Sequence, residues 1–303
     1  MRRPIARPGT SSPVTEKAGA GAGSRGFLTA KGSASPQPLY LTADRLFRIS
    51  TEMTELDWMV LGFVHESRFA TSGQLMRVFW QTSDRESGAA RVGRRALKRL
   101  CDRLVLDVLP RRVGGLRTGS HGMIYRVGRA GVKLLRTRGI SGPRVEQPGT
   151  LLLSHTLATT ELVVRLREAS RTGQLEVIEV QQEPICWRGY LGPGASRRML
   201  KPDLFVRVGA GALEDRWMIE VDLASESGRV LARKASSYVE HYRGGSEQRE
   251  HGVYPRVLWA APDERRAEQI TDVLDRQPTE ARRLFTVCRF DEVVSFLAAE
   301  ARK

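Results

Sequence analysis

Residues 201–223 read KPDLFVRVGAGALEDRWMIEVDL, in which two apolar runs flank a turn that contains glycine. This pattern predicts a β-hairpin. Because side chains alternate between the two faces of a strand, Glu220 and Asp222 share one face of the second strand. Asp203 enters the first strand and comes beside them. The stretch therefore predicts a sheet on which three carboxylates lie close together.

Carboxylates on an otherwise apolar strand are costly to bury unless a metal ion, hydrogen bonds or a basic side chain satisfies them. Sets of carboxylate oxygens suit Mg²⁺ or Mn²⁺. Lys234 and Tyr238 follow on a predicted helix, where their spacing places both on one face that can return over the strand ends. We predict that Lys234 steadies the charge on a phosphate. The predicted metal ligands are Asp203, Glu220 and Asp222.

The rest of the C-terminal half alternates helical and strand patterns around this hairpin. In chain order the patterns predict helix 154–170, strand 175–181, strands 204–208 and 216–223, helix 225–242, strand 256–260, helix 263–275, strand 284–289 and helix 291–301. Residues 186–198 contain several Gly and a Pro and predict a loop. Glu161 lies on the first helix. Together these elements predict an α/β domain with a central mixed sheet.

Residues 55–140 predict the order helix, helix, helix and hairpin, which is that of a winged helix-turn-helix. The apolar stripe of the third helix, residues 89–104, consists of Val92, Ala96, Leu97, Leu100 and Leu104. Basic residues dominate its other side, which indicates a recognition helix for the major groove of DNA, and a basic hairpin loop would form the wing. The candidate DNA contacts are Arg91, Arg94, Arg95, Lys98 and Arg99 on the helix and Arg111, Arg112 and Arg117 on the wing.

Net charge separates the two halves of the chain. Residues 1–54 carry 8 Lys/Arg and 3 Asp/Glu, and residues 55–140 carry 17 and 7, which together account for the whole net charge of +15. Residues 141–303 carry 24 of each and are neutral. The front half is therefore the region expected to attract phosphate groups, and double-stranded DNA is the expected partner.

Composition also predicts the boundaries of the domains. Residues 1–50 are expected to form a disordered basic tail and a lead-in, because the first part holds almost no large apolar side chains. The winged helix is expected over 51–140, a Gly- and Pro-containing linker over 141–153 and the α/β domain over 154–303. The sequence has no long apolar run and no cysteine framework, which predicts a cytoplasmic protein without a membrane span.

The motifs of the C-terminal half resemble those of the PD-(D/E)xK nuclease superfamily, whose elements follow the order helix, three strands, helix, strand. The resemblance implies that Asp203, which follows a proline, and Glu220 on the next strand bind a metal ion. Asp222 stands where most members carry a lysine. Variants of the superfamily place that lysine on the following helix, where Lys234 lies. An acid on the first helix, here Glu161, is a further recurrent catalytic feature.

The whole pattern resembles the replication-relaxation family of actinobacterial plasmids and mobile elements more closely. Its members similarly join a front winged helix to a back domain with KPD, ExD and K-x3-Y motifs. Here these motifs are Lys201-Pro202-Asp203, Glu220-x-Asp222 followed by Glu226, and Lys234 with Tyr238. Ser154-His155, at the start of the first helix of the back domain, is another similar feature. The resemblance implies a role in plasmid replication or DNA relaxation.

Two functions follow from these patterns. In the first, the winged helix binds DNA and the C-terminal domain nicks or cleaves it with Mg²⁺ or Mn²⁺. In the second, the protein is a non-catalytic initiator or transcriptional regulator, and a degenerate nuclease-like domain serves dimerisation or partner contact. A homodimer and replication proteins are accordingly candidate partners.

Simpler interpretations of the same acids stay open. Asp203 after a proline can be a turn or cap residue. Glu220 and Asp222 can be a structural pair of carboxylates with Arg229 or Arg233 as their partners. These interpretations differ from the metal site in one geometric respect, which is whether the carboxylates face one another or face arginines.

Overall fold

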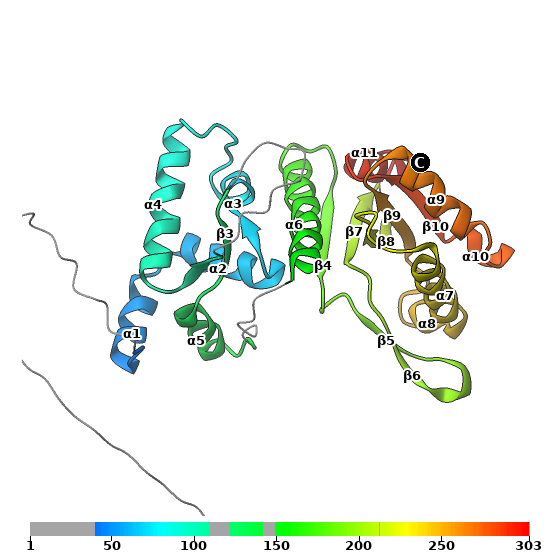
Figure 1. Cartoon of the computed structure of the whole chain (residues 1–303), viewed down its shortest axis with the longest axis horizontal. Coiled ribbons are helices and arrows are strands. Elements are labelled where there is room, and N and C mark those ends of the chain that lie inside the picture. The colour runs from blue at the N-terminus through cyan, green and yellow to red at the C-terminus, as the bar shows by residue number, and fades with distance from the viewer. Residues whose placement is uncertain (1–39, 110–121, 142–148, 212, 303) are drawn as a thin grey trace, which may run out of the picture. The chain divides into compact units, whose positions relative to one another are not determined.

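The hairpin predicted at residues 201–223 lies at the centre of a five-stranded sheet (Figure 1). The computed structural model describes residues 40–109, 122–141, 149–211 and 213–302. Within them the strands of this sheet follow the order β10-β9-β8-β7-β4. Their bounds are β4 (Val177–Gln182), β7 (Leu204–Ala210), β8 (Leu213–Val221), β9 (Arg256–Ala261) and β10 (Phe285–Arg289).

The sheet is mixed, as the sequence predicts. Strand β7 pairs antiparallel with both β4 and β8, whereas β8, β9 and β10 run parallel. The register places Leu204 opposite Ile219, and the backbone N–H of Asp203 donates to the carbonyl of Ile219 at 3.1 Å. The hairpin thus brings Asp203 level with the part of β8 that carries Glu220.

Helices cover both faces of this sheet. Helices α6 and α11 contribute to the core on one face, and α7 and α9 contribute to the core on the other. Their bounds, with those of two short helices, are α6 (Thr150–Arg171), α7 (Gly228–Gly244), α8 (Ser246–His251), α9 (Glu264–Leu274), α10 (Thr279–Arg282) and α11 (Val293–Glu300). None of the helices in the described ranges is long and apolar enough to cross a membrane.

Side chains of β8 alternate between the two cores, which confirms the predicted period of two. Trp217 and Ile219 belong to the core beneath α6 and α11, and Met218 belongs to the core beneath α7 and α9. Glu220 and Asp222 lie two and four residues after Met218, so their side chains point to the same face of the sheet as Met218. Both carboxylates therefore face the side of the sheet that α7 and α9 cover.

Residues 186–198, predicted as a loop, instead include most of a second hairpin. Strand β5 (Arg188–Leu191) pairs antiparallel with β6 (Arg197–Leu200). Tyr190 and Leu200 are buried in the core that α7 shares. This tertiary packing stabilises strands that a Gly- and Pro-rich sequence does not indicate by itself.

Helix α6 also begins earlier than predicted, at Thr150 instead of Ser154 or Thr156. Its first turn includes Leu153, which is fully buried together with Leu157 one turn later. Burial of Leu153 thus accompanies an extension of the helix into residues that the sequence assigned to the linker, although Leu151 and Leu152 in the same turn are exposed. The rest of that linker, residues 142–148, lies outside the described residues.

The front half contains the predicted succession of three helices and two antiparallel strands. It also contains α1 and α5, which the sequence analysis missed, and α1 begins before the predicted start at residue 51. The elements are α1 (Ala43–Glu52), α2 (Glu55–Ser67), β1 (Ala70–Thr71), α3 (Ser72–Phe79), α4 (Gly88–Asp102), β2 (Leu106–Val108), β3 (Ile124–Val127) and α5 (Arg129–Thr137). The three strands pair in the order β1-β3-β2.

Helix α4 buries a slightly different stripe from the predicted one. Val92 is exposed, whereas Gly93 is buried. A Cβ atom at Gly93 would lie 2.4 Å from the sulfur of Met76 on α3 and 2.8 Å from the ring of Trp80. Close packing of α3 thus leaves little room for a side chain at Gly93, whereas Ala96, Leu97 and Leu100 are buried as predicted.

From Leu41 onward the described chain forms one compact unit, and one hydrophobic core contains residues of both halves. Hydrogen bonds cross between the halves as well. The hydroxyl of Thr160 donates to the carbonyl of Phe69, and the Gln74 side chain donates to the carbonyl of Leu157, each at 3.0 Å. Helix α6 therefore joins the front helices to the C-terminal half, and Gln182 of β4 also donates directly to the Ser67 hydroxyl of α2 at 3.1 Å.

We expect His241 on α7 to make the fold sensitive to acid. Its ring is buried, its Nδ1 lies 3.0 Å from the Tyr254 hydroxyl, and burial lowers its pKa to about 4. The unfolded chain takes up this proton near pH 6.5, so the stability contributed by the neutral ring is complete above that pH and is lost as pH falls toward the folded pKa.

The variant His241→Gln does not titrate. Between about pH 7 and about pH 4.5 it should lose less unfolding free energy than the natural chain, by on the order of 1–2 kcal/mol. Urea denaturation at the two pH values measures this difference. Equal losses in both proteins would contradict the assignment.

Candidate functional site

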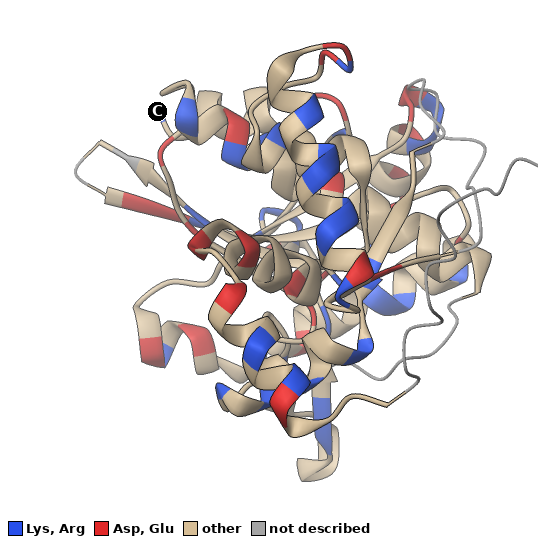
Figure 2. Cartoon of the chain, turned by 90° about the vertical axis from the view of Figure 1, so that its left-hand side faces the viewer, with Lys and Arg blue, Asp and Glu red and all other residues tan. Residues whose placement is uncertain are grey.

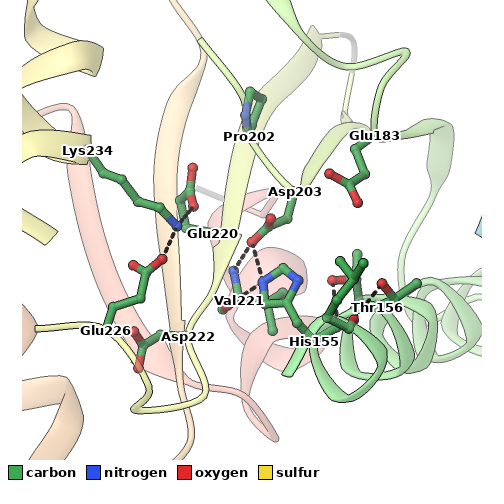
Figure 3. Close-up of polar contacts among 12 residues, drawn as sticks. His155, Thr156, Glu183, Pro202, Asp203, Glu220, Val221, Asp222, Glu226 and Lys234 are labelled. Carbon is green, nitrogen blue, oxygen red and sulfur yellow. Dashed lines mark hydrogen bonds and ion pairs between the residues drawn. The ribbon is translucent and has the colours of Figure 1, made fainter. Parts of the chain in front are cut away.

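Asp203 lies immediately before β7 and is buried. One of its carboxylate oxygens, Oδ2, accepts a hydrogen bond from the backbone N–H of Val221 at 2.7 Å and lies 3.2 Å from Nε2 of His155 (Figure 3). The position of Asp203 is therefore fixed from two directions, by the neighbouring strand β8 and by helix α6.

Glu220 lies next to it on β8, with 2% of its surface exposed. Its Oε1 accepts from the Tyr238 hydroxyl at 2.5 Å, and its Oε2 accepts from Nζ of Lys234 at 3.1 Å. Burial and then the charge of Asp203 raise the pKa of Glu220 to about 7, against the opposing influence of Lys234. The two acids are thus close enough to repel each other when both are ionised.

Lys234 projects from α7 toward these acids. Its Nζ lies 3.1 Å from Glu220 and 3.0 Å from Glu226 (Figure 3). Burial opposes the charge on Lys234, but the carboxylates of Glu220, Asp203 and Glu226 outweigh it and raise the pKa of the amine. The structure therefore places a charged lysine beside Asp203 and Glu220, although the lysine comes from the helix and not from the strand.

His155 on α6 completes this cluster from the opposite face of the sheet. Its Nε2 lies 3.2 Å from Asp203 and 3.0 Å from the carbonyl of Val221. The hydrogen bond with Asp203 raises the pKa of His155 to about 9, although burial opposes the charge. This pKa favours the imidazolium at neutral pH, whose Nε2–H donates a hydrogen bond to the Asp203 carboxylate.

Asp222 has a different environment from the other two predicted ligands. Its carboxylate accepts two hydrogen bonds from the Arg266 guanidinium, at 2.8 and 2.9 Å, and a third from the backbone N–H of Ala224 at 2.6 Å. Arg266 also donates to the carbonyl of Glu226. These contacts hold Asp222 in a buried ion pair with α9, as the simpler interpretation of this acid requires, but with Arg266 in place of Arg229 or Arg233.

The hydrogen-bond partners of Glu161 are also different from those of the acid cluster. Its carboxylate accepts from Arg77 at 2.7 Å, from Arg165 at 3.2 Å and from Gln74 at 3.2 Å. Arg77 further binds Glu168 on the same helix. The described contacts of Glu161 therefore join α3 to α6.

The donor set of this site suits one particular class of cation. Among the described residues, no group of three His, Cys, Asp or Glu side chains is arranged to hold a metal ion. Mg²⁺, however, is commonly bound by one or two carboxylates, with waters and substrate phosphates completing its shell. Asp203 and Glu220 supply two such carboxylates, and their repulsion is a reason for a cation to bind between them. The residues present therefore fit Mg²⁺ or the similar Mn²⁺.

The candidate DNA contacts on α4 divide into two groups. Arg91, Arg94, Arg95 and Lys98 are exposed, and Figure 2 shows the side of the molecule on which α4 lies, with Lys and Arg coloured blue. Arg99 instead donates two hydrogen bonds, at 2.6 and 2.9 Å, to the buried carboxylate of Asp57. The wing residues Arg111, Arg112 and Arg117 lie outside the described residues.

Sequence reasoning missed two of the residues that define this site. His155 stands out in sequence only as part of the Ser154-His155 pair, because no second histidine at metal-ligand spacing accompanies it. Arg266 is far from Asp222 in sequence, and no local pattern links them. Tyr238, which the sequence places on the same helix face as Lys234, is the hydroxyl donor to Glu220.

Together, fold and site define a mixed α/β domain with a buried cluster of two acids and a lysine, preceded by a helical region with a basic surface. The family model for replication-relaxation matches residues 61–257, which is more than half of the chain. The protein therefore belongs to the replication-relaxation family.

Comparisons with solved structures and with curated proteins give less information than the family model. Among solved structures, the restriction endonuclease FokI matches with 10% sequence identity and a TM-score of 0.26, over 81% of this chain and 44% of the endonuclease. The chain thus spans less than half the length of that enzyme. No curated protein matches the sequence significantly.

We expect Arg266→Met to destabilise the fold strongly. It would leave the carboxylate of Asp222 buried without its partner, which costs about 3–5 kcal/mol of unfolding free energy. Chemical denaturation measures the loss. The double variant Asp222→Asn with Arg266→Met should recover much of it, because no uncompensated charge remains.

The adjacent Arg265 is exposed and makes no hydrogen bond or ion pair with the described residues, so Arg265→Met is a matched control. It should change the unfolding free energy by no more than about 0.5 kcal/mol. Equal effects of the two single variants would show that the pair with Asp222 does not stabilise the protein.

Proposed function

We propose that this protein binds duplex DNA through its front half and nicks or cleaves it at Asp203, Glu220 and Lys234, with Mg²⁺ or Mn²⁺. The observation that carries the proposal is the convergence of a buried Glu220, a neighbouring Asp203 and a charged Lys234. Membership of the replication-relaxation family is consistent with a DNA substrate.

The arrangement of elements supports a PD-(D/E)xK type of nuclease domain. Asp203 precedes β7 and Glu220 lies in the antiparallel neighbour β8, so the two acids come from adjacent strands of a mixed sheet. The lysine comes from α7, as in variants of that superfamily. In this proposal Asp222 and Glu161 stabilise the domain through Arg266 and Arg77 and do not hold the metal ion.

Each residue of the site has a defined task in this proposal. Asp203 and Glu220 would hold the divalent cation, which supplies Lewis-acid stabilisation of the charge on the phosphate. Lys234 stabilises the additional negative charge of the transition state. His155 is already protonated at neutral pH and keeps Asp203 oriented, so it is not the base that accepts a proton from water.

We propose the front half as the DNA-binding domain. Helices α2, α3 and α4 with strands β2 and β3 have the order of a winged helix, in which α4 is the recognition helix. The exposed face of α4 carries basic residues at successive turns, which suits contacts with phosphates and guanine. The proposed domains are residues 51–140 and 154–303, and the first turn of α6 occupies the end of the linker expected over 141–153.

A second function is favoured by one observation. Both carboxylate oxygens of Glu220 already have donors, and Asp222 is held by Arg266. This arrangement also suits a non-catalytic initiator or regulator, whose nuclease-like domain contacts replication proteins or a second copy of the chain.

A plasmid assay separates the two functions. With Mg²⁺ or Mn²⁺ the natural protein should convert supercoiled plasmid to nicked or linear DNA, as measured by gel electrophoresis. Asp203→Asn and Glu220→Gln should each abolish the reaction, and Lys234→Met should slow it by about 10²–10³-fold.

Asp215→Asn is the matched control, since Asp215 lies on the same strand about 17 Å from Glu220. It should retain full activity. DNA binding by the natural protein without cleavage in either metal would reject the enzymatic proposal in favour of the second function.

DNA binding by α4 has its own test. Arg94→Gln with Arg95→Gln should weaken duplex binding and reduce the salt dependence of the association constant by about 1 for each phosphate contact that is lost. Fluorescence anisotropy over a range of salt concentrations measures both. Arg276→Gln, at an exposed position after α9, should have no effect. Unchanged binding in the double variant would reject α4 as the recognition helix.

A further inference from the structure

Helix α7 has two faces with different roles. Its inner face buries Leu231 and Tyr238 against the sheet and directs Lys234 to Glu220. Its outer face exposes Arg229 and Arg233, which lie one helical turn apart on the same side. Arg233 is also the immediate neighbour of Lys234. The exposed arginines therefore lie on the helix that supplies Lys234 to the acid cluster, on a different face from that lysine.

Neither of these two guanidinium groups has a partner within the described parts of the chain. The acids that could neutralise them are already engaged elsewhere. Glu226 binds Lys234, and the carboxylate of Asp222 binds Arg266. Local charge around the outer face of α7 is therefore positive, even though the C-terminal half as a whole is neutral.

The second hairpin neutralises an acid on this side of α7. Glu240 lies seven residues after Arg233 on α7, hence on the same side, and accepts from Arg198 of β6 at 2.6 Å and from Tyr190 of β5 at 3.2 Å. The hairpin is thus anchored at the far end of the row of arginines, and Figure 1 shows β5 and β6 projecting from the sheet near α7 and α8.

Arg197 lies on this hairpin next to Arg198, but its side chain is exposed and has no partner among the residues described. Strand β6 then leads through Lys201 directly to Asp203. The Nζ of Lys201 lies 4.5 Å from the centre of the Trp187 ring and also remains exposed. Because side chains alternate along a strand, Arg197 points to the face of the hairpin opposite Arg198, which contacts α7, and Arg197 is therefore not part of the surface of α7.

We propose that Arg229 and Arg233 form a second DNA-contacting surface, which binds the phosphate backbone along α7, the helix that supplies Lys234 to the acid cluster. The inference rests on the proposed DNA substrate and adds the element that positions the strand to be cut. Guanidinium groups are suited to this task because their fixed fork of donors matches phosphate oxygens. The neutral C-terminal half thus has a phosphate-binding surface of its own, produced by the way its ion pairs are distributed.

The test uses a full-length double variant that carries both Arg229→Gln and Arg233→Gln. This variant is compared with the control Arg276→Gln. Arg276 is also exposed and without a side-chain partner in the described chain, but it follows the far end of α9, about 15 Å along that helix from its first turn. Circular dichroism and thermal unfolding should show that both variants fold like the natural protein.

Duplex binding is measured by anisotropy across salt concentrations in EDTA, so the result does not depend on cleavage. The double variant should bind more weakly, and its salt dependence should fall by about 2, as expected for two lost phosphate contacts. Its hydroxyl-radical footprint should lose protection on one side while the protection due to α4 remains. Arg197→Gln, on the opposite face of the hairpin, should leave this flank unchanged.

Identical affinity, salt dependence and footprint in the double variant and in Arg276→Gln would overturn the proposal, whether or not the natural protein cleaves DNA. Loss of the whole footprint would overturn it as well, since the surface would then not be a separate contact. Failure of the proposed function has a different signature, because it would appear as absent cleavage or absent duplex binding in the natural protein itself.

Discussion

The constraint on which the C-terminal half depends is a carboxylate buried in the middle strand of its sheet. Glu220 is almost inaccessible to water, and an ionised carboxylate in such a place must find donors or remain protonated. Helix α7 supplies both donors, from Lys234 and Tyr238, one turn apart on one face. The same face carries the apolar residues that cover the sheet. The packing of α7 on the sheet therefore also brings both donors to Glu220. This explains why Lys234 and Tyr238, spaced as K-x3-Y, accompany the acid on β8.

Helix α6 connects this centre to the front half. At one position His155 binds Asp203, and further along the helix Glu161 and Glu168 bind Arg77 of α3. The continuous core beneath α6 makes it a rigid connection, because packed interiors deform little. A helix that holds both a site residue and the partners of α3 fixes the orientation of the proposed recognition helix relative to the acids. This accounts for the acid on α6 without a role in binding metal.

Local patterns predicted most of the fold and the core of the site. The period of two on β8 and the spacing of Lys234 and Tyr238 are short-range features, and the structure confirms both. The pair of Asp222 with Arg266 could not be predicted, since those residues meet only after α9 packs beside α7. The prediction of a loop at the β5–β6 hairpin was wrong for the same reason. Burial of Tyr190 and Leu200 by tertiary contacts outweighs the local preference of this sequence for turns.

Net charge was the least informative of the sequence features for the C-terminal half. Equal numbers of acidic and basic residues suggest a surface without preference for phosphate, but a sum does not record which charges are paired. The acids near α7 form ion pairs with Lys234, Arg266 and Arg198. Each of those pairs removes an acid from the neighbourhood of Arg229 and Arg233 and leaves their charge uncompensated. The buried acids that organise the site therefore also determine which cations remain exposed, so that the positive surface of α7 follows from how the cluster itself is neutralised.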